Sequence, residues 1–179
     1  MVVNMSKSVS SSAALPIAHG VLRFLIVANW VYGAVILALL VAMPNMQWIM
    51  KAFGLSPSAE AERLVLGLRA IAVFGLASVP LHYVVLKRLL AIVGTVRQGD
   101  PFVAANASRL QTIAWSLLAL QLFSIVIGAI GKAVSTPAHP VHLDAGFSIN
   151  GWLAVLLTFL LARVFAEGTL MREYLKGTV

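Results

Sequence analysis

Four long stretches of almost uncharged, apolar residues constrain this chain more than any other feature. They run over about residues 24–43, 64–86, 113–130 and 149–165. A helix of about 20 apolar residues spans the ~30 Å hydrocarbon core of a bilayer, and the last stretch is the shortest of the four. Hydrophobic residues make up 60% of the 179-residue chain and charged residues only 11%, too little polar surface to cover a water-soluble domain. The sequence therefore predicts an integral membrane protein.

The spanning segments are expected to be helices, because a backbone in hydrocarbon must make its hydrogen bonds within its own segment. The stretches lack the alternating ten-residue pattern of an outer-membrane barrel. The first stretch exceeds the about 7–15 apolar residues of a secretory signal and is not promptly followed by a small-x-small cleavage site. We therefore predict an all-α, polytopic protein built as a four-helix bundle. Residues 1–19 are expected to be a flexible cytoplasmic tail and residues 20–179 a single membrane domain.

The distribution of Lys and Arg predicts which side of the membrane each loop occupies. Four basic residues flank the spans on one side: Lys51, Arg63, Arg69 and Lys132. Nine lie on the other side: Lys7, Arg23, Lys87, Arg88, Arg97, Arg109, Arg163, Arg172 and Lys176. Because basic residues are enriched on the cytoplasmic side, both termini and the 87–112 segment are predicted to be cytoplasmic, in the inner membrane of a bacterium.

The segment between the second and third spans predicts a helical hairpin that protrudes into the cytoplasm. Apolar residues continue at helical spacing after Arg88, so a helix over residues 64–98 would rise ~52 Å, well beyond the hydrocarbon core. Gly99 is expected to end this helix. Asp100 is expected to cap the next helix, with Pro101 at its first position.

Small residues at four-residue spacing predict where helices pack closely, within the bundle or between copies of the chain. These candidate helix-packing residues are Ala34, Ala38, Ala42, Ser124, Gly128, Ala154, Thr158 and Ala162. Asn29, in the first span, is expected to lie a turn or two away from the helix interface rather than in it.

The sequence offers little material for catalysis or cofactor binding. The absence of Cys excludes disulfides, thiolate metal sites and thiol nucleophiles. No acidic residue lies in the apolar stretches to pair with His82, and neither the paired mid-membrane charges of a transporter nor a convergent catalytic set is visible. His139 and His142 could bind a metal, but their proline-rich loop does not have ligand spacing. We expect no enzyme activity, no cofactor and no metal.

The net charge of +7 is assigned to membrane topology and lipid headgroups rather than to nucleic acid. The basic residues are spread over three short segments, and none of these contains a nucleic-acid-binding motif.

Two regions of the chain carry a resemblance to a known family. The first contains Gly99-Asp100-Pro101-Phe102 with Asn106 and Leu110. The second contains Arg163-Val164-Phe165, Glu167-Gly168, Met171-Arg172-Glu173 and Gly177-Thr178-Val179. In these residues the chain resembles the small four-helix bacterial membrane proteins of domain-of-unknown-function family 2975. The resemblance extends over roughly residues 20–179. Members are often encoded beside a small Cro-type helix-turn-helix regulator, which implies a regulatory pairing at the membrane but no activity, cofactor or catalytic residue.

The resulting hypothesis is a non-enzymatic regulator or scaffold that binds a cytoplasmic partner through the hairpin and the C-terminal tail. The candidate partner-binding residues are Arg97, Asp100, Phe102, Asn106, Arg109, Glu167 and Glu173. The alternative is an accessory subunit of a larger membrane complex, with a transporter or channel less favoured.

Overall fold

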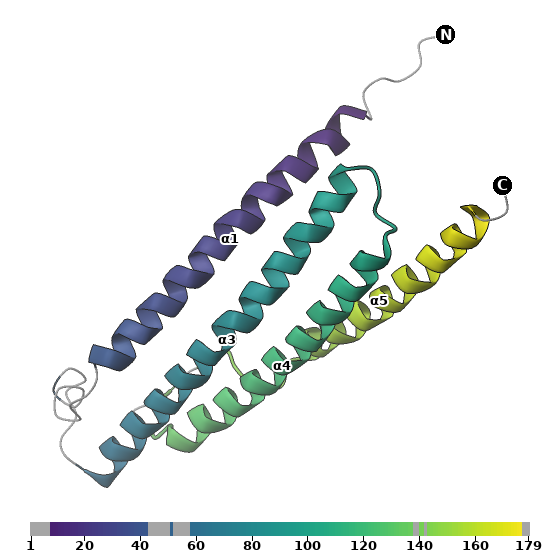
Figure 1. The fold of residues 1–179 in the computed structure, drawn as a ribbon. Helices are drawn as coiled ribbons and strands as arrows, with labels where there is room; N and C mark the ends of the chain where they lie inside the picture. The colour runs from purple at the N-terminus through teal and green to yellow at the C-terminus, as the bar shows by residue number, and fades with distance from the viewer. Residues whose placement is uncertain (1–7, 43–50, 52–57, 138–139, 142, 177–179) are drawn as a thin grey trace.

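The computed structural model describes residues 8–42, 51, 58–137, 140–141 and 143–176, and these contain four long α-helices (Figure 1). Helix α1 covers Ser8–Ala42, α3 Ala59–Arg97, α4 Ala104–Val134 and α5 Ile149–Lys176. All four are long and apolar enough to cross a membrane, which confirms an all-α protein with four candidate spans. Residues 44–50 and 52–53 and the pair His139 and His142 lie outside the described residues.

Helix boundaries differ from expectation mainly at the ends of the spans. Helix α1 begins at Ser8, so residues 8–19 are helical and not part of a tail as predicted. Helix α3 continues unbroken through Pro80 for 39 residues, a rise of about 58 Å. Helix α5 likewise continues past the fourth apolar stretch to Lys176. Both α3 and α5 are therefore longer than the ~30 Å of hydrocarbon requires.

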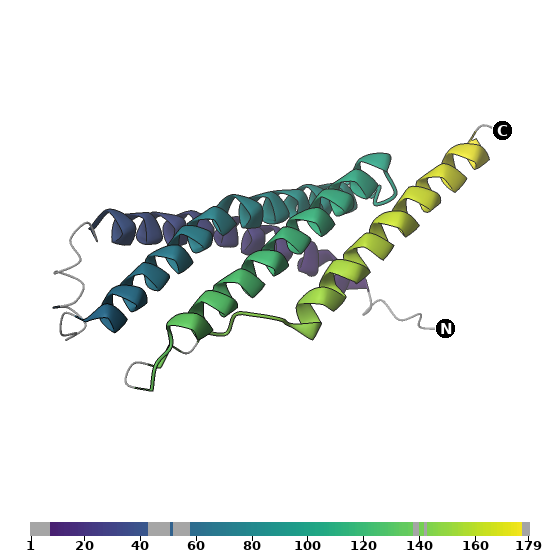
Figure 2. The same ribbon diagram turned by 90° about the horizontal axis from the view of Figure 1, so that it is seen from below.

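The helices form an open row instead of the closed four-helix bundle that we predicted (Figures 1 and 2). Helix α1 packs on α3, α3 on α4 and α4 on α5. Among the described residues, α1 contacts neither α4 nor α5, and α3 does not contact α5. Each edge helix therefore has one helical neighbour among the described residues.

Burial follows this arrangement closely. Only 6% of the apolar window of α1 is buried, against 28% in α3 and in α4. Large apolar side chains of α1 such as Phe24, Trp30 and Val41 are exposed. An apolar surface of this extent is stable when hydrocarbon, not water, surrounds it.

Helix α1 is fixed to α3 through a seam near Pro80. Asn29 donates a hydrogen bond from Nδ2 to the Val79 carbonyl at 3.1 Å, and Gly33 is buried against the Val79 side chain. The rings of Trp30 and Tyr83 are 5.6 Å apart. Asn29 therefore lies in the helix interface, contrary to our expectation.

The predicted small-residue ridge of α1 lies beside this seam and not in it. Ala34 and Ala38 are exposed, and the side chain of Ala42 is outside the described set. The contact stripe includes Asn29, Gly33 and Ile36, which is rotated around the helix from the ridge. Within the chain, the close approach to α3 uses Gly33 instead.

The small residues of α4, Ser124 and Gly128, pack against the backbone of the loop at Ala145 and Gly146 and not against another helix. Ser124 Oγ accepts a hydrogen bond from the Gly146 amide at 3.1 Å and donates one to the Gly146 carbonyl at 3.2 Å. A side chain at position 128 would lie 2.5 Å from the Ala145 carbonyl oxygen, so a glycine is required there. On α5, Ala162 is buried against Leu110 and Ile113, whereas Thr158 is half-buried and Ala154 is exposed.

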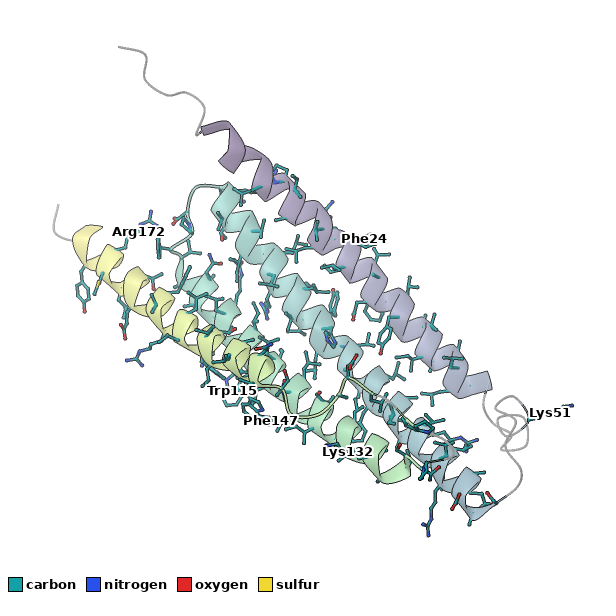
Figure 3. All side chains as sticks on the ribbon, turned by 180° about the vertical axis from the view of Figure 1, so that it is seen from behind. Phe24, Lys51, Trp115, Lys132, Phe147 and Arg172 are labelled. Atoms are coloured by element: carbon teal, nitrogen blue, oxygen red, sulfur yellow. The ribbon has the colours of Figure 1, made fainter. Side chains whose placement is uncertain are left out.

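The start of α1, the end of α5 and the 98–103 turn lie at the same end of the helical row (Figure 1). The end of α1, the start of α3 and the end of α4 lie at the opposite end. Figure 3 shows Arg172 at the first end and Lys51 and Lys132 toward the second. We call the first the turn end. These three basic residues, which the sequence assigned to opposite sides, thus lie at opposite ends of the structure.

The turn end owes its shape to the termination of α3 at a glycine. The helix stops at Arg97, and Gly99 has a φ of 82°, in the left-handed region. The Gly99 amide donates to the Val96 carbonyl and the Asp100 amide to the Thr95 carbonyl, each at 3.1 Å. These two bonds are the pattern of a Schellman motif, which confirms the predicted stop.

Gly99→Ala is expected to destabilise the protein by about 1–2 kcal/mol, because a Cβ is unfavourable in the left-handed region. The matched control is Gly94→Ala on the same helix. Its added Cβ would meet nothing within 4 Å, and Ala is favoured over Gly inside a helix by roughly 0.5–1 kcal/mol. Unfolding in mild detergent, followed by circular dichroism, compares the two variants. Equal stability of the two variants would contradict the role of Gly99.

Candidate functional site

The interior of the turn end is organised by Asn106, on the first turn of α4. Its side chain is 0% exposed. The Nδ2 atom donates to Thr95 Oγ1 at 2.7 Å and to the Pro101 carbonyl at 2.8 Å. One side chain thus connects the end of α3, the turn and the start of α4.

Arg109 completes this network from the opposite side. Its guanidinium donates to Asn106 Oδ1 at 2.8 Å and to the Ala91 carbonyl at 3.3 Å. Thr95 in turn donates to the Ile92 carbonyl at 2.7 Å. A buried amide that uses both its donor and its acceptor in this way rigidifies the backbone around it.

Because Asn106 is buried, it does not belong among the candidate partner-binding residues. A wholly buried side chain cannot contact a partner while the turn remains folded. The sequence placed Asn106 on an exposed cytoplasmic arm, whereas the fold uses it to join the two arms. Arg109 is half-buried and partly committed to the same network.

Asp100 does not cap α4 as the sequence predicted. Helix α4 begins at Ala104, four residues after Asp100, and its N-cap Val103 makes no side-chain capping bond. The Asp100 carboxylate instead accepts from the guanidinium of Arg172, on α5, in an ion pair. The same guanidinium donates to the Phe102 carbonyl at 3.2 Å.

An aromatic pair reinforces this link between the turn and α5. The Phe102 and Phe165 rings stack with centroids 5.3 Å apart and planes inclined by 29°. Gly168, one turn further along α5, lies beneath the Phe102 ring. We call the set Asp100, Phe102, Phe165, Gly168 and Arg172 the turn–α5 junction.

The remaining candidate partner-binding residues lie around this junction. Arg97 is exposed at the end of α3. Glu167 pairs with Arg163 at 2.7 Å along the exposed face of α5. The side chain of Glu173 is outside the described set. Sequence reasoning omitted Phe165 and Arg172 from the site, although both belong to the residues on which the family resemblance rests.

The model of one protein family, described as "Protein of unknown function (DUF2975)", matches residues 38–179. The chain belongs to this family. The match covers most of the chain, including α3, α4, α5 and their connections. No curated protein and no solved structure matches the chain. The family and the helices therefore identify a membrane protein of the DUF2975 family. Any function follows from the residues of this chain.

Several of the residues that carry the family resemblance in the sequence are brought together by the DUF2975 fold. Those of the turn and those of α5 are about 70 positions apart in the chain. They meet at the turn–α5 junction, and Leu110 packs in the same cluster as Phe165. The two short sequence regions thus describe one structural feature.

A metal centre is not apparent where the DUF2975 structure can be described. Within the described ranges, no group of three or more His, Asp or Glu side chains is close enough to hold an ion. The pair that the sequence raised, His139 and His142, is not among those residues.

Asn106→Ala is expected to lower the free energy of unfolding by about 1–3 kcal/mol, since it leaves the half-buried polar groups of Thr95, Pro101 and Arg109 without their Asn106 partner. Ser108→Ala, two residues further along α4 and exposed, is the control and should change stability little. Unfolding curves of both variants in the same detergent measure the difference. An Asn106→Ala protein as stable as the control would exclude a structural role for the amide.

Proposed function

We propose that this DUF2975 protein is a non-enzymatic regulator or scaffold that binds a soluble cytoplasmic protein through the 87–112 hairpin and the C-terminal half of α5. The observation that supports this proposal is the turn–α5 junction. It joins two segments, distant in the chain, into one continuous surface at the turn end. A partner would therefore meet a single preformed platform rather than two independent tails.

The side chains around the junction have the character of a protein interface. Beyond the fourth apolar stretch, α5 exposes Leu170, Met171 and Tyr174, with Tyr174 77% exposed. Phe102, in the junction itself, is 47% exposed. Aromatic and Met side chains are enriched at protein interfaces, and Arg97 adds a nearby charge. Exposed apolar residues outside a membrane span favour a protein partner as their cover.

The proposal requires that the turn end faces the cytoplasm, as the nine basic residues assigned to that side indicate. A green fluorescent protein fused after Val179 should fluoresce, and alkaline phosphatase at that position should be inactive. Alkaline phosphatase inserted after Thr136, in the opposite segment, should be active. The reverse pattern would invert the topology and place the platform outside the cell.

The partner is tested by gentle extraction of the tagged full-length protein from its native membrane, followed by mass spectrometry. The proposal expects a soluble protein at near-stoichiometric amount. Arg97→Glu should reduce its recovery about tenfold, the equivalent of 1.4 kcal/mol of binding. The matched control is Arg63→Glu, an exposed residue at the other end of the same helix.

Two results would count against a cytoplasmic partner. One is the absence of any soluble protein above the untagged background. The other is an equal loss of the partner in both charge-reversal variants, since this would indicate a general effect of charge on extraction.

A second candidate function, an accessory subunit of a membrane complex, is favoured by a different observation. Among the described helices α1 packs against α3 alone, and most of its large apolar side chains are exposed. Its exposed Ala34 and Ala38 would allow close approach of a helix from another chain. Recovery of stoichiometric membrane subunits instead of a soluble protein would support this function.

A further inference from the structure

We infer that a cavity between α3 and α4 at the turn end is a binding site for the phosphate of an anionic phospholipid. The cavity has a volume of about 300 Å³. Its lining consists of Tyr83, Val84, Lys87, Arg88, Ala91 and Arg109. Three of these six side chains are cationic and none is acidic. The cavity lies partly on the same 87–112 segment as the platform proposed above, but its binding of a lipid does not depend on a protein partner.

The three cations are not neutralised by carboxylates in the described part of the chain. Ion pairs in that part of the chain, such as Arg163–Glu167 and Arg172–Asp100, do not involve these three side chains. Lys87 instead lies over the ring of Tyr83, with Nζ 5.5 Å from its centroid. Cations that share one cavity repel each other, and a bound anion removes this cost.

Arg109 is oriented toward this cavity by the network described above. One guanidinium nitrogen is held by Asn106 Oδ1 and the Ala91 carbonyl. The planar group has five N–H donors, so several are left for a ligand. An arginine whose plane is already fixed loses less entropy when it binds a phosphate.

The position of the cavity along the membrane normal favours a lipid ligand over a soluble anion. Lys87 and Arg88 directly follow the apolar stretch 64–86, and Arg109 comes shortly before the stretch 113–130. The cations of both helices therefore lie at the border of the hydrocarbon, where phospholipid phosphates are found. Tyr83 has the position of an interfacial aromatic residue. Basic cavities between membrane helices at this level are suited to anionic headgroups.

The test measures lipid binding to the purified full-length protein by native mass spectrometry, with phosphatidylglycerol and phosphatidylcholine of equal chain length as probes. The wild-type protein should bind phosphatidylglycerol at least about tenfold more tightly. Lys87→Gln/Arg88→Gln should abolish this preference. The charge-matched control, Arg23→Gln/Arg163→Gln, removes two cations near the same end but outside the cavity and should keep the preference. Arg109 is left unchanged because it also supports the turn.

Three outcomes would overturn the assignment. The first is equal affinity of the wild-type protein for the two lipids, a result that does not depend on the folding of any variant. The second is an equal loss in the control, which would indicate diffuse attraction by the basic surface. The third is thermal stabilisation by millimolar inorganic phosphate as large as that by phosphatidylglycerol, which would identify a soluble anion as the ligand.

Discussion

The structure depends on the solvent that surrounds its apolar side chains. A row of helices in which each edge helix has one neighbour leaves most of its hydrophobic surface outside. In water such a row would collapse or aggregate. In hydrocarbon the exposed Phe, Leu and Val side chains gain no hydrophobic free energy from burial against another helix. Without a hydrophobic force between helices, contacts must come from close packing and hydrogen bonds. The contacts of this chain are of those kinds: Gly33 against Val79, Asn29 on a backbone carbonyl, and Ser124 on a loop.

At the turn end, where the chain leaves hydrocarbon, the organisation changes. Polar groups there are paired with each other, and Asn106 joins three backbone segments while Arg172 joins α5 to the turn. The ion pair is half-exposed on both sides, so its own contribution to stability is modest, of the order of 0.2–1 kcal/mol. Its role is to set where α5 lies. The rigid turn and the basic cavity share one network, because Arg109 belongs both to the Asn106 centre and to the cavity lining.

The sequence-based site is corrected at Asn106, which is wholly buried. Asn106, Asp100 and Arg109 were predicted to bind a partner because polar residues on one membrane side were taken to be exposed, but all three also make contacts within the fold. Asp100 pairs with Arg172 on α5, and Arg109 donates to the Ala91 carbonyl on α3. Asn106 donates to Thr95 across the turn. The predicted small-residue ridges failed to locate the α1–α3 contact for a related reason. Spacing identifies a face of a helix, but which face meets a neighbour depends on the rotation of the whole helix.

The sequence by itself determined the number of spans, their helical nature, the end of α3 at Gly99 and the separation of the basic residues into two groups. These features follow from local chemistry: the length of apolar runs, the backbone preference of glycine and the positions of charges along the chain. Only the tertiary structure decided that the helices form an open row, that the turn is bound to α5, and that Lys87, Arg88 and Arg109 share a cavity. Each of these results depends on contacts between distant segments, whose energies are set by the rotation and depth of each helix and are not encoded in any single stretch.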